Sequence, residues 1–175
     1  MGGITLRILF LINFAGKAGT EKYVENLVRI FSAADNECHF AYNIAGELSE
    51  KMAARGVPCL QLDLAGSPFA AAKVLAAYCR EHKIEVIHAQ YPRENIVALL
   101  SQRHYAAPRV VYTNHLTIRS GLKWRVLNRI FTPRDHKIIA VCREGRDIMI
   151  QNGVCPERIE VIYNGVEPET QPVRD

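Results

Sequence analysis

His115 is the side chain whose position most favours chemistry. It follows the apolar, β-branched run 110–113, so it falls where a buried strand would end. In an open α/β sheet, ligands bind beyond the carboxyl ends of the strands. A histidine at that edge is a candidate for catalysis or ligand binding. His88 lies inside the strand-like run 85–90 and is expected to be a hydrogen-bonded core group, whereas His39, His82, His104 and His136 are expected at the surface.

The turn after the first apolar run could hold a phosphate. Gly16, Lys17 and Gly19 follow the run 6–12 and lead into a helix-like segment. Backbone N–H groups at a helix N-terminus favour anions. The turn matches neither G-x-G-x-x-G nor the Walker pattern, and the second strand-like run, which ends at 44, is not followed by an acid suited to a ribose. Alone, the turn fits a tight strand-to-helix connection as well as it fits a phosphate site.

Composition excludes several classes of protein. The 175 residues are 49% hydrophobic and 23% charged, with a formal net charge of +4, which falls short of a nucleic-acid signature. The five cysteines are scattered and form no C-x-x-C pair, which indicates a reducing cytoplasm rather than a disulfide framework; Cys38, Cys59 and Cys79 are expected to be buried. No H-E-x-x-H motif or carboxylate cluster supports a metal site. No apolar run is long enough to span a membrane.

Strand and helix patterns alternate along the chain. Short apolar runs predict strands at 6–12, 38–44, 58–62, 85–90, 109–113, 137–142 and 159–163. Helical periodicity lies between them, at 20–34, 48–55, 68–82, 94–105, 122–131 and 144–152, with Gly56 and Gly153 as helix stops and Ser67 as an N-cap. This order predicts a Rossmann-like three-layer α/β/α fold with a mostly parallel sheet of about seven strands.

The segment 122–131 mixes basic and large apolar residues and leaves two interpretations open. It could rest on an anionic membrane surface. Arg125 and Arg129 share one side of a helix, however, and Lys123 lies roughly opposite to them. We therefore favour a core-packing helix with solvated arginines over peripheral contact with the membrane.

Five segments, in order and spread over nearly the whole chain, resemble one family. They are G-T-E-K-Y-V at 19–24, E-V-I-H-A-Q at 85–90, V-Y-T-N-H at 111–115, K-I-I-A-V-C-R-E at 137–144 and R-I-E-V-I-Y-N-G-V at 158–166. They resemble the G-G-A-E-R-x-V, D-V-V-H-A-H, V-x-T-x-H, D-x-I-I-A-V-S-x and K-I-x-V-I-x-N-G-V segments of the GT-B glycosyltransferases of family 4.

The resemblance implies the N-terminal, acceptor-side half of a two-domain GT-B enzyme. Such enzymes transfer a sugar from a nucleotide-diphosphate sugar to a carbohydrate or lipid-linked acceptor, with retention of configuration and without a metal or other cofactor. Residues 1–166 would form the acceptor-side domain and 167–175 the start of a linker or a frayed terminus. The C-terminal nucleotide-sugar-binding domain, the expected partner within the same protein, is absent from the 175 residues. The isolated domain is expected to be inactive. The resemblance also implies a role in glycan or glycolipid synthesis, in the cytoplasm or at the inner face of the membrane.

Roles for individual residues follow from the same resemblance. His115 matches the family histidine near the transferred sugar, and it is the catalytic candidate. Gly16, Lys17 and Gly19 would face the donor phosphates, and Asn164 and Gly165 would begin the hinge. Acceptor contact is expected, by location alone, from Tyr91, Arg93, Asn114 and Arg119. Departures from the family pattern are Ala18 for a glycine, Gln90 for a histidine and Cys142 for a serine.

Two other classes of protein stay open at this point. The first is a stand-alone α/β module that binds a sugar or an anion without catalysis, or completes a site with a separate chain. The second is a nucleotide-cofactor domain of the dehydrogenase type, against which the missing glycine fingerprint argues.

Overall fold

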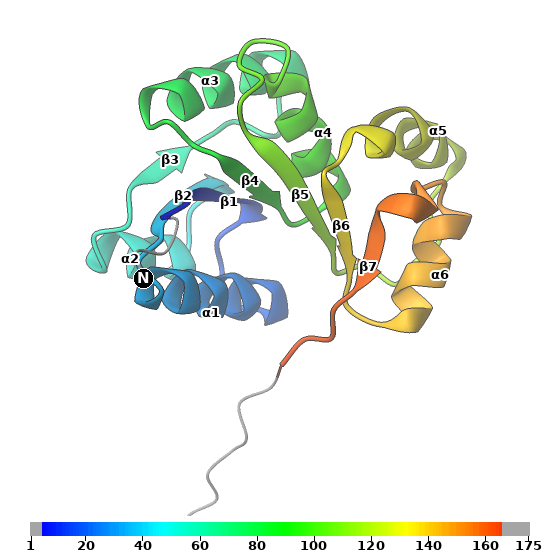
Figure 1. Ribbon diagram of the computed structural model, residues 1–175, viewed down its shortest axis with the longest axis horizontal. Coiled ribbons are helices and arrows are strands. Elements are labelled where there is room, and N and C mark those ends of the chain that lie inside the picture. The colour runs from blue at the N-terminus through cyan, green and yellow to red at the C-terminus, as the bar shows by residue number, and fades with distance from the viewer. Residues whose placement is uncertain (1–4, 166–175) are drawn as a thin grey trace, which may run out of the picture.

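Seven strands form one parallel sheet in the computed structural model, which describes residues 5–165. The strands are β1 (Arg7–Phe14), β2 (Glu37–Ile44), β3 (Cys59–Gln61), β4 (Val86–Ala89), β5 (Arg109–Asn114), β6 (Lys137–Ala140) and β7 (Ile159–Val161). Their order across the sheet is β3-β2-β1-β4-β5-β6-β7, and each neighbouring pair is parallel (Figure 1). The order reverses at β1 and β4, which is the switch point where such sheets bind ligands.

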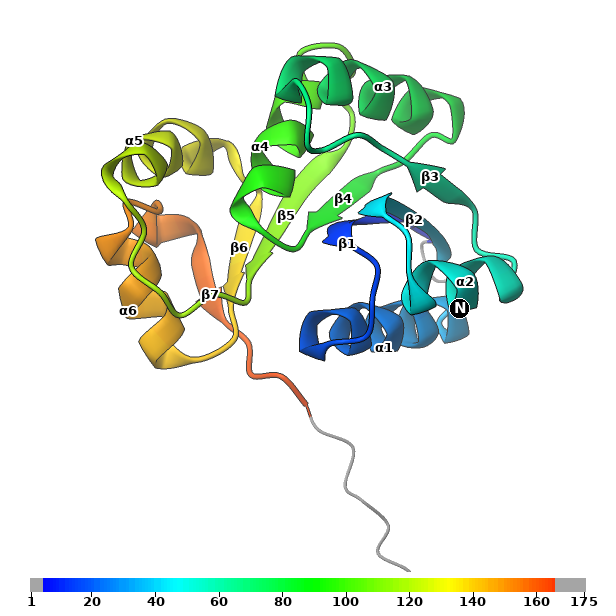
Figure 2. The ribbon, with the colours of Figure 1, turned by 180° about the vertical axis from the view of Figure 1, so that it is seen from behind.

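Helices lie on both sides of this sheet. They are α1 (Gly19–Ala33), α2 (Glu47–Ala54), α3 (Pro68–Glu81), α4 (Pro92–Ser101), α5 (Leu122–Phe131) and α6 (Arg143–Gln151), with short 3-10 turns at Thr132–Arg134 and Pro156–Arg158. Helices α1 and α2 cover one face and α3 and α4 the other, while α5 and α6 lie at the β6–β7 end (Figures 1 and 2). The predicted three-layer α/β/α fold is confirmed.

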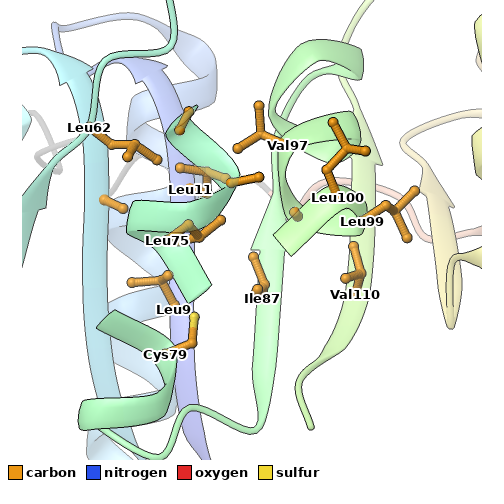
Figure 3. Packing of buried hydrophobic residues seen from close by; sticks show 14 of the residues in the cluster. Leu9, Leu11, Leu62, Leu75, Cys79, Ile87, Val97, Leu99, Leu100 and Val110 are labelled. Atoms are coloured by element: carbon orange, nitrogen blue, oxygen red, sulfur yellow. The ribbon is translucent and has the colours of Figure 1, made fainter. Parts of the chain in front are cut away.

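Strand β1 is buried on both faces because its apolar residues alternate between two cores. Leu9 and Leu11 pack with residues of α3, α4 and β4 (Figure 3). Ile8 and Phe10 point to the opposite face and pack against α1 and α2. A run without polar alternation is what a central parallel strand requires.

The expected helix signals are present. Gly56 and Gly153 follow α2 and α6 with φ of 73° and 83°, a left-handed conformation that favours glycine. The Ser67 hydroxyl accepts a hydrogen bond from the Ala70 N–H at 3.4 Å, and Pro68 occupies the first position of α3.

The turn between β1 and α1 is held by the start of α2. The Leu48 N–H donates to the carbonyl oxygens of Ala15 and Gly16 at 3.0 and 3.3 Å. Gly46 lies against this turn so closely that an added Cβ would come within 2.6 Å of the Ala15 carbonyl oxygen. The position of the turn therefore depends on a glycine in the next strand-to-helix connection.

Replacing Gly46 with alanine should destabilise the fold. The new methyl group meets backbone atoms, which cannot move aside as a side chain can, so we expect a loss of about 1–3 kcal/mol in the free energy of unfolding. Urea denaturation measures it. Gly19→Ala is the matched control, because a Cβ at Gly19 meets nothing within 4 Å. Equal stability of the two variants would show that the turn is not held in this way.

Three expectations from the sequence are wrong. His39 is fully buried, since its ring bonds to the Tyr78 hydroxyl and the Glu37 carboxylate, at 2.9 and 3.0 Å. Cys59 is exposed, because β3 is a three-residue edge strand. Helix α5 is not mainly core-packing: Leu122, Val126 and Ile130 are 75%, 47% and 54% exposed.

Two further observations concern the membrane and the chain's C-terminal end. Within residues 5–165, no helix combines the length and apolar character that crossing a bilayer requires. Asn164 and Gly165 follow β7 as exposed residues without regular secondary structure. The predicted linker, 167–175, lies outside the described residues, and the hinge role of Asn164 and Gly165 stays a prediction.

Candidate functional site

A cavity of about 620 Å³ opens at the carboxyl edge of the sheet. The ends of β1 and β5 form its floor, and the start of α4, the loop 115–121, α5 and the end of α6 form its walls. Its lining combines amide, aromatic and apolar side chains with two arginines. The lining residues are Asn13, Phe14, Ala18, Glu21, Tyr91, Pro92, Arg93, Glu94, Tyr112, Asn114, Leu116, Ile118, Arg119, Ser120, Gly121, Trp124, Asn128, Met149, Asn152 and Val154.

The structure brings together the four residues expected to contact an acceptor. Tyr91, Arg93, Asn114 and Arg119 all line the cavity. Tyr91 precedes α4, and its hydroxyl lies 2.8 Å from the Thr20 hydroxyl of α1. Their shared position agrees with a binding role, and that role stays a prediction.

Two of these side chains also shape the surrounding loops. Arg93 donates to the carbonyl oxygens of Ala65 and Gly66, at 2.9 and 3.1 Å. Asn114 ends β5, and its amide accepts from the Leu116 N–H and donates to the Leu116 carbonyl at 3.2 and 3.1 Å. Asn114 therefore fixes the beginning of the loop that covers the cavity.

His115 lies beside the cavity, on the α1 side of β5. Its Nε2 is 3.0 Å from the side-chain oxygen of Gln90, and its ring packs edge-on against Tyr23, with centroids 5.0 Å apart. The Tyr91 ring, whose centroid is 5.9 Å from that of His115, also lines the cavity, so it links the histidine to the cavity wall. Burial lowers the pKa of His115 to about 4, so the imidazole is neutral at pH 7.

Gly16, Lys17 and Gly19 line a second hollow of about 430 Å³ around the start of α1. The two hollows meet at Ala18 and Glu21, which line both of them. The first turn therefore adjoins the cavity without forming part of its floor.

The charges of this second hollow are largely paired internally. Lys17 Nζ lies 3.3 Å from one carboxylate oxygen of Glu47, and Lys51 lies 3.0 Å from the other. No side chain caps α1, whose N-cap is Ala18, and the space above Gly19 is open. What this turn offers an anion is thus the helix N-terminus, an unobstructed approach and a lysine that also contacts Glu47.

A buried carboxyl at the cavity wall was not identified from the sequence. Glu94 is 1% exposed, and its Oε1 has no hydrogen-bond partner among the described residues. Asp135 is fully buried nearby, and one of its oxygens accepts from the Asn95 amide at 2.9 Å. Burial raises the pKa of Glu94 to about 7 and that of Asp135 to about 8, because desolvation outweighs their hydrogen bonds and the opposing charges of Arg93 and Arg158.

These two carboxyls should make the fold less stable as the pH rises. Both pKa values are raised, from 4.5 and 3.8, so the folded state binds more protons than the unfolded state. Their contribution is complete below about pH 4, and it is lost as pH rises through 7 and 8, by at most about 1.4 kcal/mol per pH unit for each group. Urea denaturation between pH 4 and pH 8.5 measures the slope. Glu94→Gln with Asp135→Asn should flatten it; an unchanged slope would contradict the assignment.

Asn152 is a second residue that the sequence did not identify. Its amide accepts from the Ser120 N–H and donates to the Ile118 carbonyl, both at 2.8 Å, and its backbone carbonyl accepts from Asn128 at 2.9 Å. It thereby ties the end of α6 to the cavity loop and to α5. The sequence predicts it only as the last residue of a helix that Gly153 ends, so nothing local indicates this role.

No metal centre is formed by the described part of the chain, where no group of three or more His, Cys, Asp or Glu side chains is placed to hold an ion. The histidines at the ligand edge are instead bonded to neutral groups. His88 Nε2 lies 2.7 Å from the Thr113 hydroxyl, which makes it the hydrogen-bonded core group expected from the sequence.

Solved structures of similar fold extend well beyond the length of this chain. One is Anabaena Alr3699/HepE in complex with UDP-glucose, 18% identical over 93% of this chain and 44% of that chain, with a TM-score of 0.76. Another is a glycosyltransferase from Rickettsia africae ESF-5, 14% identical over 94% of this chain and 44% of that chain, also with a TM-score of 0.76. The lipopolysaccharide outer core galactosyltransferase WaaB, in its apo form, is 15% identical over 97% and 50%, with a TM-score of 0.73.

The chain spans about half the length of these structures, whose low identities establish the fold alone. Comparison with curated protein sequences gives no significant match. The family profile described as Glycosyltransferase Family 4 matches residues 18–170, which is most of the chain. The chain therefore belongs to Glycosyltransferase Family 4, and its fold is that of the N-terminal domain of a GT-B glycosyltransferase.

Proposed function

We propose that residues 1–166 are the acceptor-binding domain of a retaining, metal-independent glycosyltransferase that acts in glycan or glycolipid synthesis. The observation that carries the proposal is the cavity of about 620 Å³ at the switch point of the sheet, beside His115 and the first turn. Its amides, arginines and Trp124 suit a carbohydrate, since sugar rings present both hydroxyls and apolar C–H faces.

The catalytic contribution of this domain is positioning. In transfer from a nucleotide-diphosphate sugar, the cavity would orient the acceptor hydroxyl, and the N-terminus of α1 would face the leaving diphosphate. Lys17, which also lies 3.3 Å from Glu47, is the one basic residue of the first turn, so we expect most of the positive charge for that diphosphate to come from another domain. We therefore expect residues 1–175 to bind an acceptor and to transfer no sugar without a nucleotide-sugar-binding domain.

The reading frame beyond Asp175 tests whether acceptor binding and nucleotide-sugar binding belong to two domains of one protein. We expect it to continue for about 180–200 residues, a typical domain size, with a basic pair and an E-x₇-E-like carboxylate spacing. A stop codon directly after Asp175 would contradict a self-contained catalyst. That result would favour the binding module without catalysis.

We also propose that α5 contacts the cytoplasmic surface of an anionic membrane. Exposed Leu122, Val126 and Ile130 form one stripe, since they are spaced four residues apart. At about 100° per residue, Lys123 lies on one side of this stripe and Arg125 on the other. An apolar stripe with basic residues on both sides suits the boundary between the headgroups and the acyl chains of a membrane. A lipid-linked acceptor would lie at that boundary.

Co-sedimentation with vesicles tests the contact. We expect binding to phosphatidylglycerol vesicles that weakens with salt and is reduced at least about fivefold by Ile130→Glu. Ile30→Glu on α1 is the matched control, because Ile30 and Ile130 are both 54% exposed. Equal losses from both variants, or equal binding to neutral phosphatidylcholine vesicles, would contradict the proposal.

A further inference from the structure

The side chain of Gln90 has only one orientation consistent with its surroundings. Gln90 follows β4 directly and is fully buried. Its Nε2 donates to the backbone carbonyl of His88 at 3.2 Å. A carbonyl oxygen can only accept, so the amide nitrogen must face His88 and the amide oxygen must face the other way. That oxygen lies 3.0 Å from Nε2 of His115.

This orientation determines which nitrogen of His115 carries a proton. The Gln90 oxygen cannot donate, so the short contact is a hydrogen bond only if His115 Nε2 is the N–H donor. Within residues 5–165, the contact with Gln90 is the one hydrogen bond of the His115 ring, and Nδ1 has no partner from the protein. A neutral ring protonated at Nε2 therefore keeps an unshared lone pair at Nδ1.

The groups around His115 keep the ring neutral. The aromatic rings of Tyr23 and Tyr91 pack against it, and burial raises the pKa of both phenols, so neither is charged near pH 7. Burial, and secondarily the neighbouring His115, lowers the pKa of His88 to about 3. Burial alone lowers the pKa of His115, and no carboxylate among the described residues acts against it.

We propose that Gln90 is the positioning residue for His115, and that it holds the imidazole as the Nε2–H tautomer so that Nδ1 accepts a hydrogen bond from a substrate hydroxyl. A bare Nδ1 repels a phosphate oxygen and accepts from an alcohol. The histidine then recognises a sugar hydroxyl, while the anionic part of a donor must be bound by other groups. This assignment deepens the proposed function and rests on it for the identity of the substrate.

The tautomer can be measured without any substrate. Long-range ¹H–¹⁵N NMR of the uniformly ¹⁵N-labelled 175-residue chain, with His115→Ala to assign the resonances, distinguishes protonated from bare ring nitrogens. We expect a protonated Nε2 and a bare Nδ1 between pH 6 and pH 8. A protonated Nδ1 in the unmodified chain would overturn the assignment, whether or not the protein transfers sugar.

Two variants of Gln90 test whether this residue is the cause. Gln90→Glu replaces the amide oxygen with a carboxylate and should raise the pKa of His115 by about 1 to 3. Gln90→Leu removes the acceptor and should give a mixture of both tautomers, with the amide spectrum showing that the fold is kept. Gln61→Glu adds the same charge on exposed β3 and should leave His115 unchanged. A single unchanged Nε2–H tautomer in folded Gln90→Leu would overturn the role of Gln90.

Sugar transfer by the complete enzyme gives a second, separate measurement. With Gln90→Glu, the rate should fall as pH drops through the raised pKa of His115, because an imidazolium has no lone pair to offer a hydroxyl. The unmodified enzyme should show no such step above pH 5. If the NMR results hold and this pH step is missing, the tautomer is fixed as proposed but does not serve the substrate, and the substrate part of the proposal is wrong.

Discussion

Replacing His115 with alanine in the complete enzyme should reduce sugar transfer by about 100-fold, the usual cost of losing one preorganised contact at a reacting centre. His115 follows β5 directly at the ligand edge, where Gln90 and Tyr23 contact its ring beside the cavity. The loss should appear in kcat more than in acceptor KM, because Tyr91, and not His115, lines the cavity. Steady-state kinetics with the nucleotide-sugar donor measures both constants.

The fold should be little affected by this change. His115 is half-buried and lies after the last residue of β5, so alanine leaves the strand ladder intact. His136→Ala is the matched control, since His136 is exposed at the opposite edge of the sheet, before β6. Turnover of His115→Ala equal to that of the control would refute the catalytic assignment.

Gly19→Ala should weaken use of the donor while leaving stability unchanged or slightly higher. A Cβ at Gly19 points into open space, and alanine suits the first turn of α1 better than glycine. If the donor diphosphate approaches the helix N-terminus there, the methyl group occupies its path. We expect donor KM to rise about tenfold or more, because binding of phosphate by backbone N–H groups requires close approach.

Gly121→Ala provides the comparison, because Gly121 also has open space above it and precedes a helix, α5, at the cavity of about 620 Å³. It should leave donor KM unchanged. Equal donor KM for Gly19→Ala and the unmodified enzyme would mean that the first turn is only a tight connection. The pairing of Lys17 with Glu47 makes Lys17→Ala a weaker test of the same idea.

The sheet could be predicted from the sequence because its signals are local. The uninterrupted apolar run of β1 indicated burial on both faces, and Gly56 and Gly153 marked the ends of α2 and α6. The ligand edge followed from the order of strands and helices. For this reason the sequence alone predicts that Tyr91, Asn114 and His115 lie at the same edge of the sheet.

Residues whose roles depend on distant partners could not be predicted. Glu94 and Asp135 are far apart in the sequence, yet both are buried and both lie close enough to Tyr112 to raise its pKa, which no local sequence pattern indicates. His39 has a polar side chain in a strand, and one of the two hydrogen-bond partners of its buried ring, Tyr78, comes from the distant helix α3. The orientation of Gln90 likewise depends on His88 and on the ring of His115, one strand away.

Trp124 allows the central claim, that the cavity is an acceptor site, to be tested directly. It is the single tryptophan of the chain and lines the cavity, so its fluorescence reports on whatever binds there. Titration of the 175-residue chain with carbohydrate and lipid-linked acceptors should give a saturable change that Asn114→Ala weakens. Nucleotide-diphosphate sugars alone should give little change. A saturable response to nucleotide-sugar with none to any acceptor would contradict the account.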